Sequence, residues 1–388
     1  MDYVDVIYNI FFTSEGMIPL TLSCLIIVLL IRFYGKPEED TSKQELKELW
    51  DKHQDRFPTL NEKDSGDNKQ SLKFGQNFQQ SKREMTTKNT VSGIHILREV
   101  QRETRLIATS YGKCSVHIIG ELRSPKTIFT LPEIGTSHLQ CFPALVQELA
   151  SLPDIFEEYC IIHASYAGHL EAGNEGCYDF PTSFGDVQKM IWEVLDSLSI
   201  SYFIGIGVGF GATTLLHMAC FLPSSFFGLI LICPFGEGEK MGYGEELILS
   251  DLATSPSSHA TLNLLFSPTI LASSSINANH RVSWRHFNKH AVSSLFRSLI
   301  DSKPCLSDSS ISALSSTPIL LASGGFKSST KFSFLSLDRT ENTSQLAHRL
   351  IEERVRCELV IEEKAGFLIT EENSDARIAV KIFIETLE

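Results

Sequence analysis

Three patterns are missing from this sequence, and each absence removes a class of function. No two of its nine cysteines are spaced as a CxxC pair, which argues against the common zinc and dithiol redox motifs. Lysine and arginine number 34 against 47 acidic residues, so a basic face for nucleic-acid phosphates is not expected. The pentapeptide GxSxG, which mounts a serine nucleophile on a sharp strand-to-helix turn, does not occur.

The cysteines and histidines give no sign of a disulfide framework or a metal site. An odd number of cysteines, several inside apolar runs, is typical of reduced thiols buried in a core; examples are Cys160, Cys220, Cys233 and Cys357. His286 and His290 have a spacing that can bind a metal, but a third ligand of the right type is not evident. We therefore expect a solvated helix there, and no metal or cofactor.

The N-terminal region contains one uncharged run, "GMIPLTLSCLIIVLLI", from residue 16 to 31. Together with the next three residues, Arg-Phe-Tyr, it predicts a single-pass transmembrane helix over 17–34. A secretory signal peptide is the rival interpretation, but no basic residue precedes Arg32. A buried core helix is a weaker alternative. Basic residues after the run predict a short non-cytoplasmic tail over 1–16 and a cytoplasmic C-terminal domain.

A charged segment follows the uncharged run. Residues 36–88 contain 11 basic and 11 acidic residues with few apolar ones. Such a composition cannot bury enough apolar surface to offset the ordering entropy, so 35–93 is predicted to be a flexible tether. A short helix is expected within "SKQELKELWDK", where Ser42 and Glu45 form a capping box. It either docks on a partner, on the membrane or on the folded domain, or stays solvated.

Strand-like and helix-like segments alternate from about residue 94 to the end. Apolar runs such as "YCIIHA" and "FGLILIC" alternate with amphipathic stretches such as "DVQKMIWEVLDSL". This alternation predicts an α/β domain over 94–388, with a mostly parallel sheet and helices on both faces. A serine-rich insert at about 237–315 is predicted to form a helical cap.

The stretch "YFIGIGVGFGA", residues 202–212, contains glycines at alternate positions in a strand–turn–helix context. The dinucleotide-binding GxGxxG pattern fails here, because the third glycine comes one position early. The spacing Gly207-x-Gly209-x-Gly211 fits the nucleophile elbow instead, with Gly209 where the nucleophile would be.

This elbow resembles that of the N-myc downstream-regulated (NDR) family, an α/β-hydrolase-fold family whose elbow also carries glycine. Further segments resemble the family in order and spacing: "TSYGKCSVHIIG", "IFTLPEIGTSHLQCF", "YCIIHASYAGH" and "YDFPTSFGDVQKM". In the second segment Pro132 replaces the family's histidine, while Gly135 and His138 match. The likeness is good over roughly 100–235, poor in the cap and moderate over 317–388.

The remaining triad positions also lack catalytic side chains when they are compared with the hydrolase pattern. The acid position falls on Gly325 and the histidine position on Phe367. Serine attack needs a hydroxyl, a base and a group that orients the base, and none of these is expected at the three strand ends. An oxyanion hole is not expected where Pro132 and Glu133 stand.

The resemblance implies a non-catalytic scaffold or adaptor that acts through protein partners in signalling, stress response, differentiation or trafficking. The partners would bind the α/β domain or the cap, and the membrane would hold 17–34. The alternative is a hydrolase or a small-ligand receptor that uses a pocket beneath the cap. The candidate lining of that pocket is Pro132, His138, His163 and Ser323.

Overall fold

The computed structural model describes residues 101–152, 155–169, 180–235, 284, 287–302, 306–324, 339–362, 369–372 and 374–387. The chain divides into two units, Met1–Lys69 and Gln70–Glu388, and every described residue belongs to the second. The tail predicted over 1–16, the helix predicted over 17–34 and the tether predicted over 35–93 therefore lie outside the described residues.

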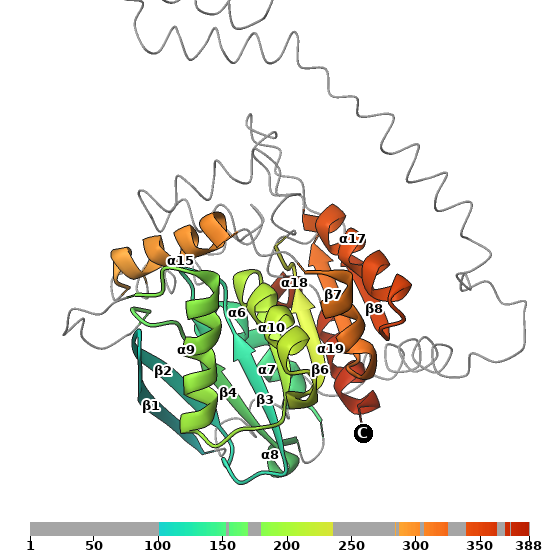
Figure 1. Cartoon of the computed structure of the whole chain (residues 1–388). Helices are drawn as coiled ribbons and strands as arrows, with labels where there is room; N and C mark the ends of the chain where they lie inside the picture. Colours follow the sequence, from blue (N-terminus) through green and yellow to red (C-terminus); the bar gives the residue numbers. More distant parts are fainter. Residues whose placement is uncertain are drawn as a thin grey trace, which may run out of the picture. The chain divides into compact units, whose positions relative to one another are not determined.

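Within the described residues, eight strands form one sheet in the spatial order β1-β2-β4-β3-β5-β6-β7-β8 (Figure 1). β1 and β2 form an antiparallel hairpin, and β2 also pairs antiparallel with β4. The remaining neighbours, from β4 through β3 and β5 to β8, are parallel. The strands are β1 Arg102–Thr109, β2 Gly112–Ile119, β3 Lys126–Leu131, β4 Tyr159–Ala164, β5 Phe203–Val208, β6 Phe226–Ile232, β7 Ile319–Gly324 and β8 Cys357–Glu362. The mostly parallel sheet predicted from the alternation is confirmed.

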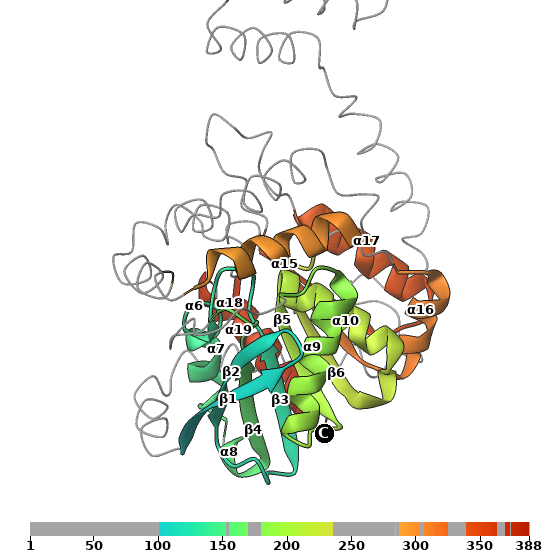
Figure 2. The ribbon, with the colours of Figure 1, turned by 60° about the vertical axis from the view of Figure 1, so that its left-hand side comes forward.

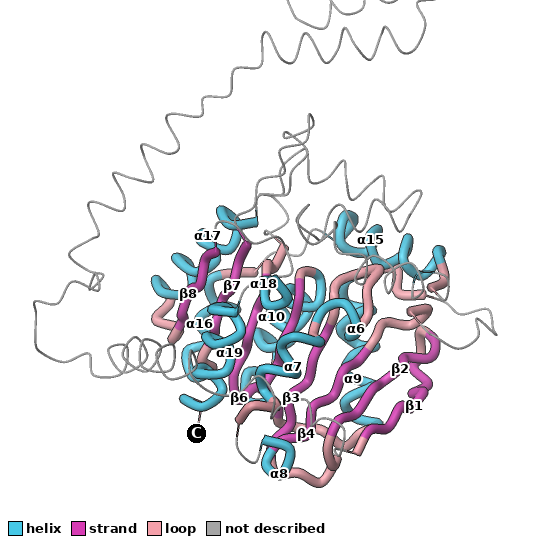
Figure 3. Tube along the Cα trace, turned by 180° about the vertical axis from the view of Figure 1, so that it is seen from behind, coloured by secondary structure: helices cyan, strands magenta, loops and turns pink. Residues whose placement is uncertain are grey.

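Helices cover both faces of this sheet and enclose two apolar clusters. One face packs against α9 Phe184–Ser197, α10 Phe210–Phe221, α16 Asp308–Ser312 and α17 Arg339–Glu352. The other face, seen from behind in Figure 3, packs against α6 His138–Cys141, α7 Pro143–Leu149, α8 Ile155–Glu158, α18 Ile369–Glu372 and α19 Ser374–Thr386. The central strands are therefore buried on both sides, which explains why they are apolar along their whole length.

Capping boxes explain where two of the helices, α9 and α6, begin. Ser183 accepts a hydrogen bond from the backbone N–H of Asp186, and the Asp186 carboxylate accepts from Ser183 in return. Ser137 and Gln140 make the same reciprocal pair at α6. Each pair satisfies backbone N–H groups that the first helical turn leaves without intrahelical partners.

The described part of the cap insert contains the helix α15, Lys289–Ser302. This helix lies at the end of the sheet where the parallel strands terminate (Figures 1 and 2). The backbone N–H of Asn288 donates to the carbonyl of Gly168, and Ser294 donates to the carbonyl of Pro181. Its buried side chains join the same apolar cluster as α9 and α10, so this part of the insert is an integral layer of the domain.

The predicted membrane localisation is corrected. No helix in the described part of the chain is long and apolar enough to cross a bilayer. The uncharged run on which that prediction rested has 16 residues, short of the roughly 20 that a spanning helix needs. The expected span over 17–34 reached the lower limit only by counting Arg32 and its two aromatic neighbours. The anchored, cytoplasm-facing topology is withdrawn.

Candidate functional site at the turn between β5 and α10

The turn between β5 and α10 has the backbone conformation of a nucleophile elbow. Gly209 is the single residue between the two elements, with φ 53° and ψ −111°. Its N–H donates to the carbonyl of Ile232 on the neighbouring strand, and its carbonyl accepts from Thr213 in the helix. A positive φ is a conformation that glycine adopts without a Cβ penalty. The strand–turn–helix geometry is therefore present without a side chain at its apex.

The alternate glycines face α10, and the residues between them face the opposite side of the sheet. Ile204, Ile206 and Val208 belong to the cluster under α7 and α19. On the other side, a Cβ built on Gly207 would lie 2.4 Å from backbone atoms of Ala212. The glycines thus let the helix rest directly on the strand, which accounts for the pattern in the sequence.

The third glycine of the pattern makes a close contact between the helix and a neighbouring strand. A Cβ on Gly211 would lie 2.4 Å from the carbonyl oxygen of Leu131, at the end of β3. Since β3 and β5 are parallel neighbours, with Leu131 in register with Gly207, this contact fixes α10 across both strands. It also brings the start of the helix next to the loop that follows β3.

The loop after β3 places a buried carboxylate at the start of α10. Glu133 is 1% exposed, and one of its oxygens accepts from the backbone N–H of Phe210, at 3.2 Å. The other oxygen accepts from the N–H of Ile134, at 2.7 Å. In serine hydrolases of this architecture, the amide after the nucleophile and an amide of this loop form the oxyanion hole. The sequence predicted no such hole here; the two amides are present, and Glu133 binds both.

The same loop is held from two further directions. The Gly135 N–H donates to Nε2 of His169 at 2.9 Å, so the neutral ring carries its proton on Nδ1. Tyr166 donates its hydroxyl to the carbonyl of Pro132. Burial lowers the pKa of His169 to about 4, and the ring stays neutral at physiological pH. His169 therefore serves as a structural acceptor for the loop.

Two of the residues predicted to line a pocket lie together in a row of rings. His138 and His163 are stacked with centroids 5.2 Å apart, and His117 stacks on His138 at 4.7 Å. Burial, and then the charges of His138 and His117, hold the pKa of His163 well below its usual range. Burial, and then His117, lower the pKa of His138 to about 4. His138 and His163 are therefore neutral, packed rings at neutral pH.

The other predicted lining residues have partners of their own. Ser323, at the end of β7, is fully buried and its hydroxyl lies 3.7 Å from the Sγ atom of Cys233. Gly325 and Phe367 lie outside the described residues. The pocket beneath the cap and the emptied triad positions remain predictions from the sequence.

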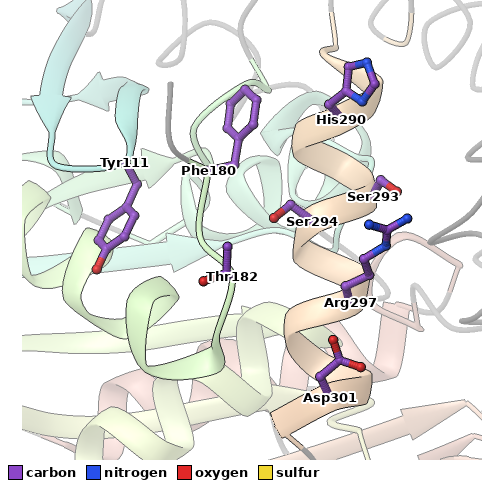
Figure 4. Close-up of a pocket in the computed structure, with 8 residues that line it drawn as sticks. All are labelled: Tyr111, Phe180, Thr182, His290, Ser293, Ser294, Arg297 and Asp301. Carbon is purple, nitrogen blue, oxygen red and sulfur yellow. The ribbon is translucent and has the colours of Figure 1, made fainter. Parts of the chain in front are cut away.

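A cavity of about 660 Å³ lies between α15, the β1–β2 turn and the segment before α9 (Figure 4). Tyr111 from the hairpin and Arg297 from α15 lie on opposite sides of it. Tyr111 donates to a carboxylate oxygen of Asp186 at 2.7 Å, and this bond raises the pKa of the phenol to about 12. The wall contains Tyr111, Phe180, Thr182, His290, Ser293, Ser294, Arg297 and Asp301. It is a surface hollow beside the cap helix, and sequence reasoning did not find it because its members come from three separate segments.

The stretch of chain that contains the elbow matches a known family. The sequence model of the Ndr family matches residues 104–261, from β1 through the elbow and past β6. This region of the chain is similar to the Ndr family. The resemblance inferred from the elbow and its flanking segments is confirmed.

Curated Ndr relatives match over about a third of the chain. Protein NDRG2 of Bos taurus is 31% identical over 134 residues, which cover 34% of this chain and 37% of the relative. Human Protein NDRG2 is 30% identical, covering 34% and 36%. Protein NDRG3 of Xenopus tropicalis is 30% identical, covering 32% and 33%. The chain thus spans about a third of the length of the curated Ndr relatives it matches.

Solved structures of enzymes share this architecture over most of the chain. A serine hydrolase from Cycloclasticus zankles has a TM-score of 0.56 at 17% identity, covering 74% of this chain and 98% of its own. The carboxylesterase CesB from Bacillus subtilis has a TM-score of 0.56 at 13% identity, covering 81% and 97%. At these identities the likeness shows the α/β-hydrolase fold and nothing of activity.

Proposed function

We propose that this chain is a non-catalytic Ndr-type protein that acts by binding other proteins, as a scaffold or adaptor in signalling, stress response, differentiation or trafficking. The observation that carries the proposal is Gly209, which stands alone at the apex of the elbow with φ 53°. A hydrolase of this fold attacks its substrate with a side chain at this position. The match of residues 104–261 to the Ndr family supports the same conclusion.

The shortest hydroxyl–imidazole contact in the described part of the chain does not replace the missing nucleophile. Thr130 and Nδ1 of His163 are 2.6 Å apart, a distance that a catalytic pair would show. However, these two residues are only 2% and 3% exposed, on paired positions of β3 and β4. A substrate carbonyl cannot reach a hydroxyl buried between two strands. This pair is best explained as a satisfied polar contact in the core.

The catalytic part of the proposal is tested with a fluorophosphonate probe on the intact chain. We expect no labelling and no esterase turnover above that of a heat-unfolded sample, with an active serine esterase as positive control. Gly209→Ser alone should also remain unlabelled, because Gly325 and Phe367 offer neither an acid nor a base. Labelling of the unmutated chain that disappears when one serine or cysteine is replaced would refute the proposal.

The binding part is tested by co-purification of the tagged intact chain followed by size-exclusion chromatography. We expect at least one protein to co-elute in a fixed molar ratio. A chain that elutes alone at its own mass, from every cell type that expresses it, would contradict an adaptor role. The two experiments are independent, so the absence of catalysis can hold even if the binding result fails.

A further inference from the structure

The two backbone amides at Ile134 and Phe210 come from segments far apart in the chain and converge on one carboxylate. Ile134 lies in the loop after β3, and Phe210 is the first residue of the 12-residue helix α10. Gly209 offers no side-chain cap to this helix, so its first N–H groups need an acceptor from elsewhere. Glu133 supplies that acceptor from 77 positions earlier in the chain.

We propose that the Ile134 and Phe210 amides form a carboxylate-binding site that the chain fills with its own Glu133. In an enzyme of this fold, the same pair of donors holds the negative oxygen of a tetrahedral intermediate. Here the Glu133 carboxyl group takes that place. This inference goes beyond the proposed function, because the site is filled whether or not the chain binds partners.

The surroundings show that the carboxylate is held in place by the fold. The backbone carbonyl of Glu133 accepts from both the N–H and the hydroxyl of Thr136, at 3.2 and 2.8 Å. The loop is also fixed through Pro132 to Tyr166 and through Gly135 to His169. A side chain on a loop with this many constraints has little freedom to leave. The arrangement also favours a negative charge, because the N-terminal end of a helix carries a partial positive charge.

Two separate features oppose catalysis at this turn. One is the missing nucleophile at Gly209, and the other is an amide pair that is already occupied. Restoring a serine would leave the second obstacle in place, since both donors would still point at Glu133. The site is therefore closed by the chain itself, and its natural ligand class is a carboxylate.

The test is chemical rescue of Glu133→Ala by sodium acetate, measured by thermal unfolding of the full chain. Loss of two charge-assisted hydrogen bonds from a buried site should lower Tm by about 10 °C. Acetate at about 0.2 M should restore at least about 2 °C relative to sodium chloride of equal ionic strength. The wild type and Glu133→Gln, whose sites stay filled, should show no acetate-specific gain. An equal response of all three proteins, or no acetate effect on Glu133→Ala, would overturn the proposal.

A second measurement keeps the proposal falsifiable if Glu133→Ala does not fold. In Glu133→Gln, the neutral amide oxygen is a weaker acceptor than a carboxylate. The amide proton resonances of Ile134 and Phe210 should then move upfield in an NMR spectrum, because their hydrogen bonds lengthen. Thr136, which bonds to the Glu133 carbonyl, is the internal reference and should move less. Unchanged resonances for both Ile134 and Phe210 would overturn the proposal.

Discussion

The close approach of α10 to two strands predicts that an alanine at Gly211 will be far more damaging than an alanine at Gly205. A Cβ on Gly211 would lie 2.4 Å from the Leu131 carbonyl oxygen and 2.8 Å from its carbonyl carbon. These are backbone atoms in the middle of a parallel sheet, and they cannot move aside as a side chain can. A Cβ on Gly205 would meet the side chains of Leu229 at 3.0 Å and Leu215 at 3.4 Å.

The two substitutions differ in magnitude for this reason. Replacing glycine by alanine restricts the unfolded chain and by itself stabilises a protein by about 0.4–1 kcal/mol. At Gly205 the tight contact with flexible leucine ends offsets this gain, so we expect a change within about 1 kcal/mol of the wild type. At Gly211 the helix must shift away from β3, and overpacking of this kind costs about 3 kcal/mol or more. Such a loss is a large fraction of the roughly 5–15 kcal/mol that stabilises a folded domain.

The assay is urea unfolding of both variants, followed by tryptophan fluorescence and by far-ultraviolet circular dichroism. Gly211→Ala should shift the midpoint strongly to lower urea or fail to fold, while Gly205→Ala should unfold near the wild-type midpoint. The m-values should agree, which would show that the midpoints report stability. If Gly211→Ala is as stable as Gly205→Ala, the helix does not rest on β3 as described and the explanation of the glycine pattern is wrong.

Two further predictions follow from the buried titratable groups. Burial lowers the folded-state pKa of His138, His169 and His217 to about 4, so the unfolded chain binds protons before the folded chain does as the pH falls. The free energy of unfolding should therefore fall as the pH drops from about 6.5 towards 4. NMR titration should show no protonation of these three histidines between pH 8 and 5, and a midpoint near 6.5 for any of them would contradict this. Burial also raises the pKa of Cys114 and Cys141 to about 12. Among the six cysteines that the structure describes, a thiol reagent at pH 8 should therefore label the half-buried Cys220 first, and rapid native-state labelling of either buried thiol would show that the core opens.

Most of the fold was predictable because its strands and helices follow strong apolar periodicity. The strand β4 matches the predicted segment "YCIIHA" residue for residue, and β6 begins and ends one residue before the predicted segment "FGLILIC". The antiparallel edge strand β1 was weaker in the sequence: its segment "RETRLIAT" is polar and mostly exposed, so no apolar run indicates it. Only the resemblance of the following hairpin pointed to that edge.

The site was predictable in its backbone but not in its hydrogen bonds. The spacing of the glycines identified the elbow, because a close strand–helix contact requires glycines at positions that are near one another in the sequence. The bond from Phe210 to Glu133 joins positions 77 apart, and a local pattern cannot show it. The corrected membrane localisation rested on an uncharged run of 16 residues, which is shorter than the roughly 20 that a spanning helix needs.

The pairing of β6 with β7 has a consequence for how this protein tolerates changes of length. These neighbours are in register from Leu229 with Ile319 to Ile232 with Ala322, yet the whole cap insert lies between them in sequence. The entropy lost on closing such a long connection grows only with the logarithm of its length, by about 0.6 kcal/mol per doubling. Lengthening this connection at a point away from Trp284, Phe287, α15 and α16, which belong to the apolar core, should therefore change the stability of the sheet little. The cap can vary in size while the strands beneath it keep their register.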